Sequence, residues 1–168
     1  GSAVWLASLT EMLSLEPHLN VHVLLKCPLN DDKLVKKLLG KENVRFIDPW
    51  SDKENSAIRR CLAPLKRMVL DTEAAANIIQ IICLNLQPYR ILVRGPAILY
   101  RICGEVKISS RLIAYITNPP SHSDFNGMQK MLAIHNSSVL TLLQTPMAVN
   151  SFIRICGGRA IRTKIDIL

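Results

Sequence analysis

Residues 90–122, RILVRGPAILYRICGEVKISSRLIAYITNPPSH, decide the fold that this sequence predicts. Two short apolar runs, residues 90–94 and 111–117, stop at a Gly-Pro pair and at an Asn-Pro-Pro triplet, respectively. Short apolar runs that end at such breakers predict buried strands, and residues 96–102 between them predict a short helix. In a sheet of parallel strands, ligands bind at the carboxyl ends of the strands. We therefore expect a site where these two runs end.

Outward from this stretch, helices and strands alternate along the chain. Helices are predicted over residues 3–16, 30–39, 72–86, 124–134 and 145–156, with Ser2 and Thr72 as expected N-caps of the first and third. Further strands are predicted over residues 21–25, 44–47, 139–143 and 165–168. This alternation predicts a single α/β domain over residues 1–168. It would be a three-layer, Rossmann-like parallel sheet of about six strands flanked by helices.

Composition favours a folded protein in a reducing compartment. The sequence is 49% hydrophobic and 20% charged, which suits a packed core and argues against disorder. No apolar run approaches the roughly 18–20 residues that span a bilayer, and the first residues do not have the pattern of a signal peptide. Five scattered cysteines form no CxxC pair. We therefore predict reduced thiols, a cytoplasmic location and no metal site.

The net charge of +8 favours anionic partners, and 5% aromatic residues without a base-stacking pattern argue against nucleic acid. Four cations lie in a basic segment, residues 58–70: Arg59, Arg60, Lys66 and Arg67. On a broken amphipathic helix they would form a basic rim beside an apolar face. One interpretation is contact with an anionic membrane surface or a lipid-phosphate acceptor. The other, commoner for charge runs, is a solvated face of a crossover helix.

Polar and cationic residues gather where the predicted strands end. These are Arg94, Asn118, His122 and Thr145. Three of them also have a plain structural explanation, Arg94 as a strand-end charge, Asn118 as a turn residue and Thr145 as a helix cap. Thr145 opens a helix, whose N–H groups suit a phosphate or a sugar hydroxyl. The sequence contains no GxGxxG, P-loop, HExxH or GxSxG motif, and no catalytic residue can be assigned.

Five segments, taken together, also point to a known family. They are GSAVWLASLTEML with NVHVLLK (residues 1–26), YRILVRGP (89–96), RLIAYITNPPSH (111–122), SSVLTLLQTPMAVNSFIRI (137–155) and RTKIDIL (162–168). In order and spacing they resemble the amino-terminal domain of GT-B glycosyltransferases. This retaining family includes glycogen and sucrose synthases and bacterial mannosyltransferases.

The resemblance implies an acceptor-side domain whose first strand and carboxyl-terminal nucleotide-sugar domain are missing from this chain. No pair of glutamates has the spacing of the family's E-x7-E signature, which lies in that second domain. Gly1 and Ser2 would match the glycine loop that faces the donor phosphates. Arg94 would face the cleft, and Thr145 matches the family's serine. Asn118 stands where many members carry a histidine, with His122 four residues later.

The implied function is transfer of a sugar from a nucleotide-sugar co-substrate to a glycan or lipid-linked acceptor, as in bacterial polysaccharide biosynthesis. No metal or other cofactor is expected, and the enzyme would work in the cytoplasm, in peripheral contact with the inner face of the membrane. This chain alone would be inactive. Two alternatives remain open, namely a non-catalytic, flavodoxin-like interaction module and one half of a nucleotide-sugar epimerase.

Overall fold

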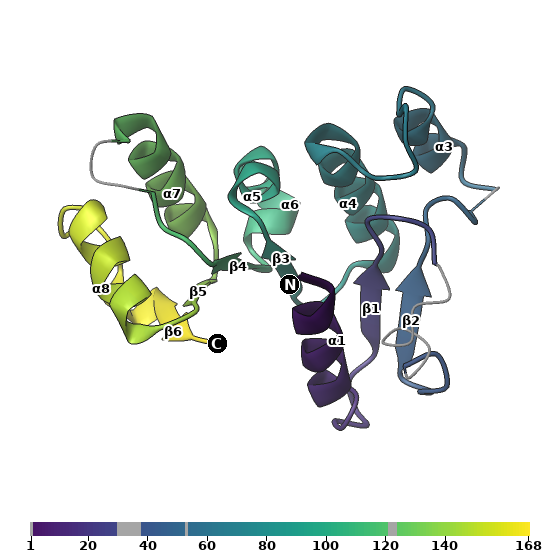
Figure 1. The fold of residues 1–168 in the computed structure, drawn as a ribbon, viewed down its shortest axis with the longest axis horizontal. Helices are drawn as coiled ribbons and strands as arrows, with labels where there is room; N and C mark the ends of the chain where they lie inside the picture. The colour runs from purple at the N-terminus through teal and green to yellow at the C-terminus, as the bar shows by residue number, and fades with distance from the viewer. Residues whose placement is uncertain (1, 30–37, 53, 121–123) are drawn as a thin grey trace. The chain divides into compact units, whose positions relative to one another are not determined.

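A computed structural model describes residues 2–29, 38–52, 54–120 and 124–168 of the chain. Most of the helix predicted over residues 30–39 lies outside these ranges. The chain divides into two compact units, Gly1–Ala74 and Ala75–Leu168. The boundary falls inside the helix α4 (Thr72–Leu86) (Figure 1).

The first unit contains a parallel sheet of two strands. Its described elements are α1 (Ser2–Leu13), β1 (Val21–Leu24), β2 (Val44–Ile47) and α3 (Ser56–Leu62). Val21 of β1 pairs with Val44 of β2, and the ladder continues to the last residue of both strands. Buried Val23, Leu25 and Val44 form a small core, against which Leu6 of α1 packs.

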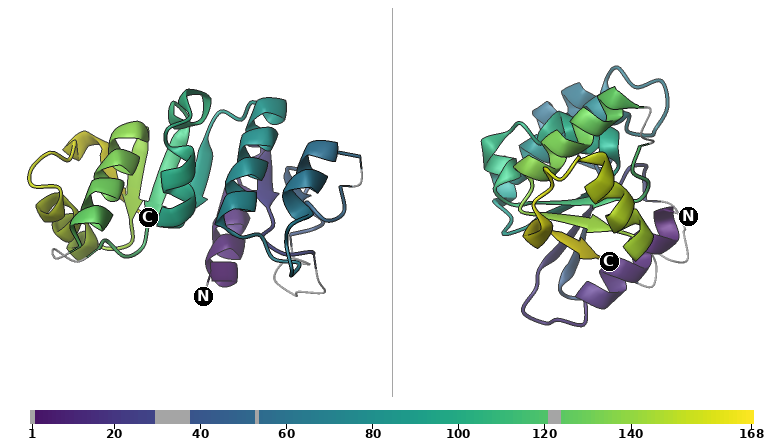
Figure 2. Two further views of the ribbon diagram at one scale, coloured as in Figure 1. Left: turned by 90° about the horizontal axis from the view of Figure 1, so that it is seen from above. Right: turned by 90° about the vertical axis from the view of Figure 1, so that its left-hand side faces the viewer.

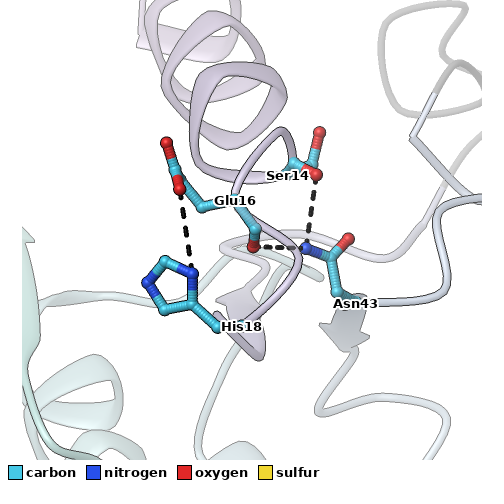
Figure 3. Close-up of polar contacts among 4 residues, drawn as sticks. All are labelled: Ser14, Glu16, His18 and Asn43. Atoms are coloured by element: carbon cyan, nitrogen blue, oxygen red, sulfur yellow. Dashed lines mark hydrogen bonds and ion pairs between the residues drawn. The ribbon is translucent and has the colours of Figure 1, made fainter.

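Asn43, directly before β2, forms hydrogen bonds with the residues that follow α1 (Figure 3). Its Nδ2 group donates to the carbonyl oxygen of Ser14 at 3.3 Å and to that of Glu16 at 3.2 Å. Close by, the exposed His18 lies 3.8 Å from the Glu16 carboxylate, measured from Nδ1 to Oε2. The amide therefore gives the Ser14 carbonyl a donor, and it gives a second donor to the Glu16 carbonyl, which also accepts the backbone N–H of Leu19 at 3.0 Å.

The predicted bounds of α4 are confirmed, but its predicted cap is wrong. The sequence favoured Thr72 as N-cap, whereas the structure has Thr72 as the first helical residue. The Asp71 carboxylate oxygen Oδ1 instead accepts the N–H of Ala74 at 2.8 Å. A carboxylate at this position also interacts favourably with the positive end of the helix dipole, which a hydroxyl cannot do.

The second unit is built on four parallel strands in the order β3-β4-β5-β6. After α4, its elements follow one another as β3 (Ile91–Arg94), α5 (Pro96–Ile102), α6 (Val106–Ser109), β4 (Leu112–Ile116), α7 (Phe125–Ser137), β5 (Leu140–Leu143), α8 (Pro146–Ile155), the 3-10 turn η1 (Arg162–Lys164) and β6 (Ile165–Ile167). Glycine or proline stands at several of these boundaries, as the sequence predicted.

One face of the four-stranded sheet carries the main core. Leu112, Ala114 and Ile116 alternate along β4 and belong to this core, because side chains two apart point to the same face of a strand. Helices α4 to α8 all contribute side chains to it, among them Phe152 of α8, which is fully buried. Figure 2 shows α5 and α7 side by side over this face.

The prediction of about six parallel strands flanked by helices is confirmed for the residues that the structure describes, and the difference lies in how the strands pair. Hydrogen bonds join them into sheets of two and four strands, whereas the sequence predicted one sheet. Strand pairing is decided by contacts distant along the chain, which the pattern of residues in each strand does not encode. In the part of the chain that the structure describes, no helix combines the length and the apolar character needed to cross a bilayer.

Candidate ligand site at the carboxyl edge of the four-stranded sheet

Arg94 is the last residue of β3 and pairs with Tyr115 of β4. The carbon of its guanidinium group lies 5.9 Å from the centre of the Tyr115 ring, within the range of a cation–π interaction. Tyr115 is buried, while Arg94 is half-buried, with its Nη1 atom enclosed. Tyr115 on the neighbouring strand β4 therefore restrains the permanently charged guanidinium group of Arg94 at the edge where we expected a ligand.

Gly95 gives the chain its turn directly after this arginine. Its φ angle of 110° lies in a region that favours glycine. A Cβ atom added here would meet nothing within 4 Å, so the requirement comes from the backbone angles alone. Pro96 follows as the first residue of α5, where its missing N–H costs no hydrogen bond.

Asn118 is exposed and lies two residues beyond the end of β4. The two prolines that follow it are half-buried, and the chain reaches α7 at its N-cap Asp124, whose Oδ1 accepts the N–H of Gly127 at 2.8 Å. His122, predicted to belong to the same site, lies outside the described residues. Asn118 thus offers an amide close to the end of β4.

Thr145 is the N-cap of α8, as its position before a helix predicted. Its hydroxyl oxygen accepts the N–H of Ala148 at 3.1 Å, and its carbonyl accepts that of Val149 at 3.1 Å. Since Pro146 has no N–H, the first turn offers a ligand at most the N–H of Met147. This end of α8 therefore suits a single hydroxyl better than the several oxygens of a phosphate.

The register of the strands brings two of these residues to one level. Ile116 of β4 pairs with Leu143 of β5. Asn118 comes two residues after Ile116, and Thr145 comes two residues after Leu143, so the two residues lie at the same level beyond neighbouring strands. Arg94 lies level with Tyr115, one residue before the end of β4. The edge therefore presents a guanidinium group, an amide and a hydroxyl from three consecutive strands. Such groups can hold a sugar or a phosphorylated sugar by donating hydrogen bonds.

Two other predicted site residues are not placed by the structure. Gly1 lies outside the described residues, and so does the side chain of Ser2, the first residue of α1. Both belong to the first unit, whereas Arg94, Asn118 and Thr145 belong to the second. Their predicted role opposite the donor phosphates stays a prediction.

The basic segment is exposed, and it is only partly helical. Arg59 and Arg60 lie in the last turn of α3, and Lys66 and Arg67 lie in the irregular chain after Pro64, all four exposed. The predicted break at the proline is therefore confirmed. A continuous amphipathic face is not present, because the residues after it do not return to a helix.

A buried histidine in the second unit was missed by the sequence reasoning. His135 of α7 is fully buried, and its Nε2 accepts the backbone N–H of Ile161 at 2.9 Å. Its proton must then reside on Nδ1, which lies 2.8 Å from the hydroxyl oxygen of Thr141. Burial, and secondarily the charge of Lys164, lowers the pKa of His135. The ring therefore stays neutral and ties the chain before β6 to α7.

The signal that could have found His135 is its helical spacing. It lies four residues after buried Met131 and three before buried Ser138, on the inner stripe of α7. Its edge-to-face contact with Phe152, with ring centres 5.4 Å apart, completes a structural role. A fully enclosed ring with both nitrogens engaged is not available to a substrate.

Three of the five cysteines are poor candidates for a nucleophile. All five are free, and burial raises the pKa of the Cys83, Cys103 and Cys156 thiols. A protonated thiol is a poor nucleophile, so these three act as small apolar side chains. Among the described residues, no three His, Cys, Asp or Glu side chains are grouped so that they could hold a metal ion.

Comparison with known proteins identifies no relative of this chain. The chain matches no family model, no curated protein and no solved structure.

Proposed function

We propose that this chain is the acceptor-binding domain of a glycosyltransferase with the GT-B architecture. In the proposal, the whole enzyme takes a sugar from a nucleotide-sugar bound mainly by a second domain. It transfers that sugar to a glycan or lipid-linked acceptor, without a metal or another cofactor. The finer description of the fold, a three-layer Rossmann-like arrangement, belongs to the same proposal.

The observation that carries the proposal is the position of Arg94. Its guanidinium group ends a parallel strand, and the ring of Tyr115 on the next strand restrains it at 5.9 Å. A planar, permanently charged donor in a fixed place suits the phosphate oxygens of a lipid-linked acceptor or the hydroxyls of a sugar. Asn118 and Thr145 would add an amide and a hydroxyl from the next two strands.

Such groups would position an acceptor and leave the bond-breaking step to the closed, two-domain enzyme. Closure around a cleft excludes water and completes a catalytic arrangement in many enzymes of two domains. The three described residues of the candidate site, Arg94, Asn118 and Thr145, are an arginine, an amide and a hydroxyl, and none of them is a carboxylate or a histidine that could serve as a general base. In the proposal, this domain therefore contributes orientation and electrostatic stabilisation, and it releases no nucleotide by itself.

The test uses the whole protein and a set of nucleotide-sugars. We expect nucleotide release from at least one of them, and product analysis should show transfer or hydrolysis of the sugar. Arg94→Met should lower kcat/KM for acceptor transfer about 10- to 100-fold, the effect of losing a charged hydrogen bond. Tyr115→Phe, which keeps the ring, should retain most activity, whereas Tyr115→Leu should not.

Arg154→Met is the matched control, because Arg154 is an exposed arginine in the last turn of α8. It should leave activity unchanged. The proposal fails if no nucleotide-sugar is consumed, or if Arg94→Met is as active as the control. Conversion of the donor to an epimer, without release of the nucleotide, would instead favour the epimerase alternative.

A further inference from the structure

The basic segment carries charge of one sign only. Between Glu54 and Asp71 the sequence has four cations and no carboxylate. All four cationic side chains are exposed. Carboxylates flank the segment at Asp52, Glu54 and Asp71. Asp52 lines the same depression as Arg59, and its Oδ1 accepts the backbone N–H of Asn55 at 3.0 Å. The segment is therefore a local excess of positive charge on the first unit.

Exposed apolar side chains follow the last two cations directly. Met68 and Val69 are 57% and 46% exposed, although water is unfavourable for both side chains. The next residue, Leu70, is 2% exposed, and its N–H donates to the carbonyl oxygen of Lys26 at 2.8 Å. On the other side, Ile58 anchors α3 at 2% exposure. The apolar pair thus projects from a segment that is fixed at both ends.

A shallow depression of about 350 Å³ begins beside this segment. It is lined by Pro49, Trp50, Asp52, Arg59, Leu62 and Ala63. Trp50 is half-buried there, and tryptophan is the side chain most typical of the boundary between water and lipid. Cations, an exposed apolar pair and an indole ring therefore occur within one short part of the chain.

We propose that this part of the first unit docks on the surface of an anionic phospholipid bilayer. The four cations would attract lipid phosphates, Met68 and Val69 would enter the boundary between headgroups and acyl chains, and Trp50 would lie at that boundary. The inference does not depend on the function proposed above. A bilayer is a better partner than nucleic acid because Met68 and Val69 can be buried among acyl chains, whereas a phosphate backbone offers them no apolar surface.

The size of the electrostatic effect can be estimated. Each Lys or Arg close to an anionic membrane strengthens binding about fivefold, so four should act over roughly two to three orders of magnitude. That part of the affinity should fall with added salt. Burial of Met68 and Val69 does not depend on screening, so the two contributions can be separated.

The experiment measures binding to phosphatidylcholine vesicles with and without phosphatidylglycerol. Binding is followed by co-sedimentation and by the emission of Trp50, in a Trp5→Phe background that leaves one tryptophan. We expect binding and a blue shift only with phosphatidylglycerol. Replacing Arg59, Arg60, Lys66 and Arg67 together with Gln should weaken binding at least about 100-fold.

The matched control replaces three other exposed arginines and one lysine with Gln, which changes the net charge equally. These residues are Arg45, Lys107, Arg154 and Arg162. The control should retain binding within a few fold. A second variant, Met68→Ser with Val69→Ser, should fold because both side chains are exposed. It should bind about tenfold more weakly and lose the blue shift, while keeping the salt dependence.

Several results would overturn the inference. They are an equal loss of binding in the control, equal binding to vesicles without phosphatidylglycerol, no binding at all, and tighter binding to a short RNA than to vesicles. An unchanged blue shift in the Met68→Ser, Val69→Ser variant would also overturn it. Because the assay contains no nucleotide-sugar, its outcome is independent of the glycosyltransferase test.

Discussion

The two parallel sheets of this chain differ in the amount of core behind them. Among the described residues, the cluster on the two-stranded sheet has three buried members, Val23, Leu25 and Val44, with partly buried neighbours, and Ile58 and Leu70 are buried elsewhere in the same unit. The four-stranded sheet has fifteen, contributed by three strands and by helices α4 to α8. Because stability grows with the apolar area that folding removes from water, the second unit should be the more stable one. A small unit with an exposed basic segment is also the part better able to adjust to a surface.

The largest expected effect is that of emptying the larger core. Phe152→Ala should cost about 3–5 kcal/mol and unfold the second unit first, because the side chain is fully buried. Val23→Ala should cost about 2 kcal/mol and act on the first unit. Residue-resolved hydrogen exchange distinguishes the two. If both variants lower the protection of both sheets together, the chain is one cooperative domain, as the sequence predicted.

An intermediate effect is expected at His135, which belongs to the larger core. Its pKa is lowered in the folded protein by burial and by Lys164. The unfolded chain therefore binds a proton at a higher pH than the folded one. The stabilising contribution is present above the ordinary pKa of 6.5 and is lost as the pH falls below it toward the folded value.

His135→Phe should remove this dependence on pH. At pH 7.5 it should also lower the free energy of unfolding by about 1–3 kcal/mol, because the N–H of Ile161 and the hydroxyl of Thr141 lose their partner. Urea unfolding at several pH values between about 5 and 7.5 provides the measurement. His18→Gln, at an exposed position of the first unit, is the control. An equally steep pH dependence in His135→Phe would refute the assignment.

The smallest expected effect is that of Asn43→Ala in the first unit. The change removes hydrogen bonds to the carbonyls of Ser14 and Glu16 and should cost about 1 kcal/mol, since this region is partly exposed. Hydrogen exchange should increase in β1 and β2 alone. Asn136→Ala is the matched control, because only the backbone carbonyl of Asn136 accepts a hydrogen bond from Lys164. Equal effects of the two changes would contradict the role of the Asn43 side chain.

The bounds of helices and strands could be predicted from the sequence where helix-breaking or capping residues mark their ends. The bounds of β2, α4 and α5 are those predicted, because Gly, Pro and Asp residues mark their ends. The N-cap role of Thr145 was also predictable from its place before Pro146. The N-cap of α4 was predicted wrongly because Asp71 and Thr72 are adjacent and both are good capping residues. Which of the two caps the helix depends on the local backbone geometry.

Features that depend on distant residues did not follow from the sequence. The contact of Arg94 with Tyr115 requires the register of two strands, which neither strand specifies alone. The burial of His135 depends on α8 and on the chain near Ile161, far along the sequence. The candidate edge was thus located from strand ends, while the group that restrains its arginine was found only in three dimensions.

The alternation of side chains along β4 determines where the protein can tolerate the insertion or deletion of a residue. Leu112, Ala114 and Ile116 face the main core, and their neighbours face the other way. One codon inserted or deleted within this strand would turn every later side chain to the opposite face. The same change in the exposed turn at residues 157–159 would reverse no strand. Natural variation in length should therefore collect in that turn and be purged from the strand.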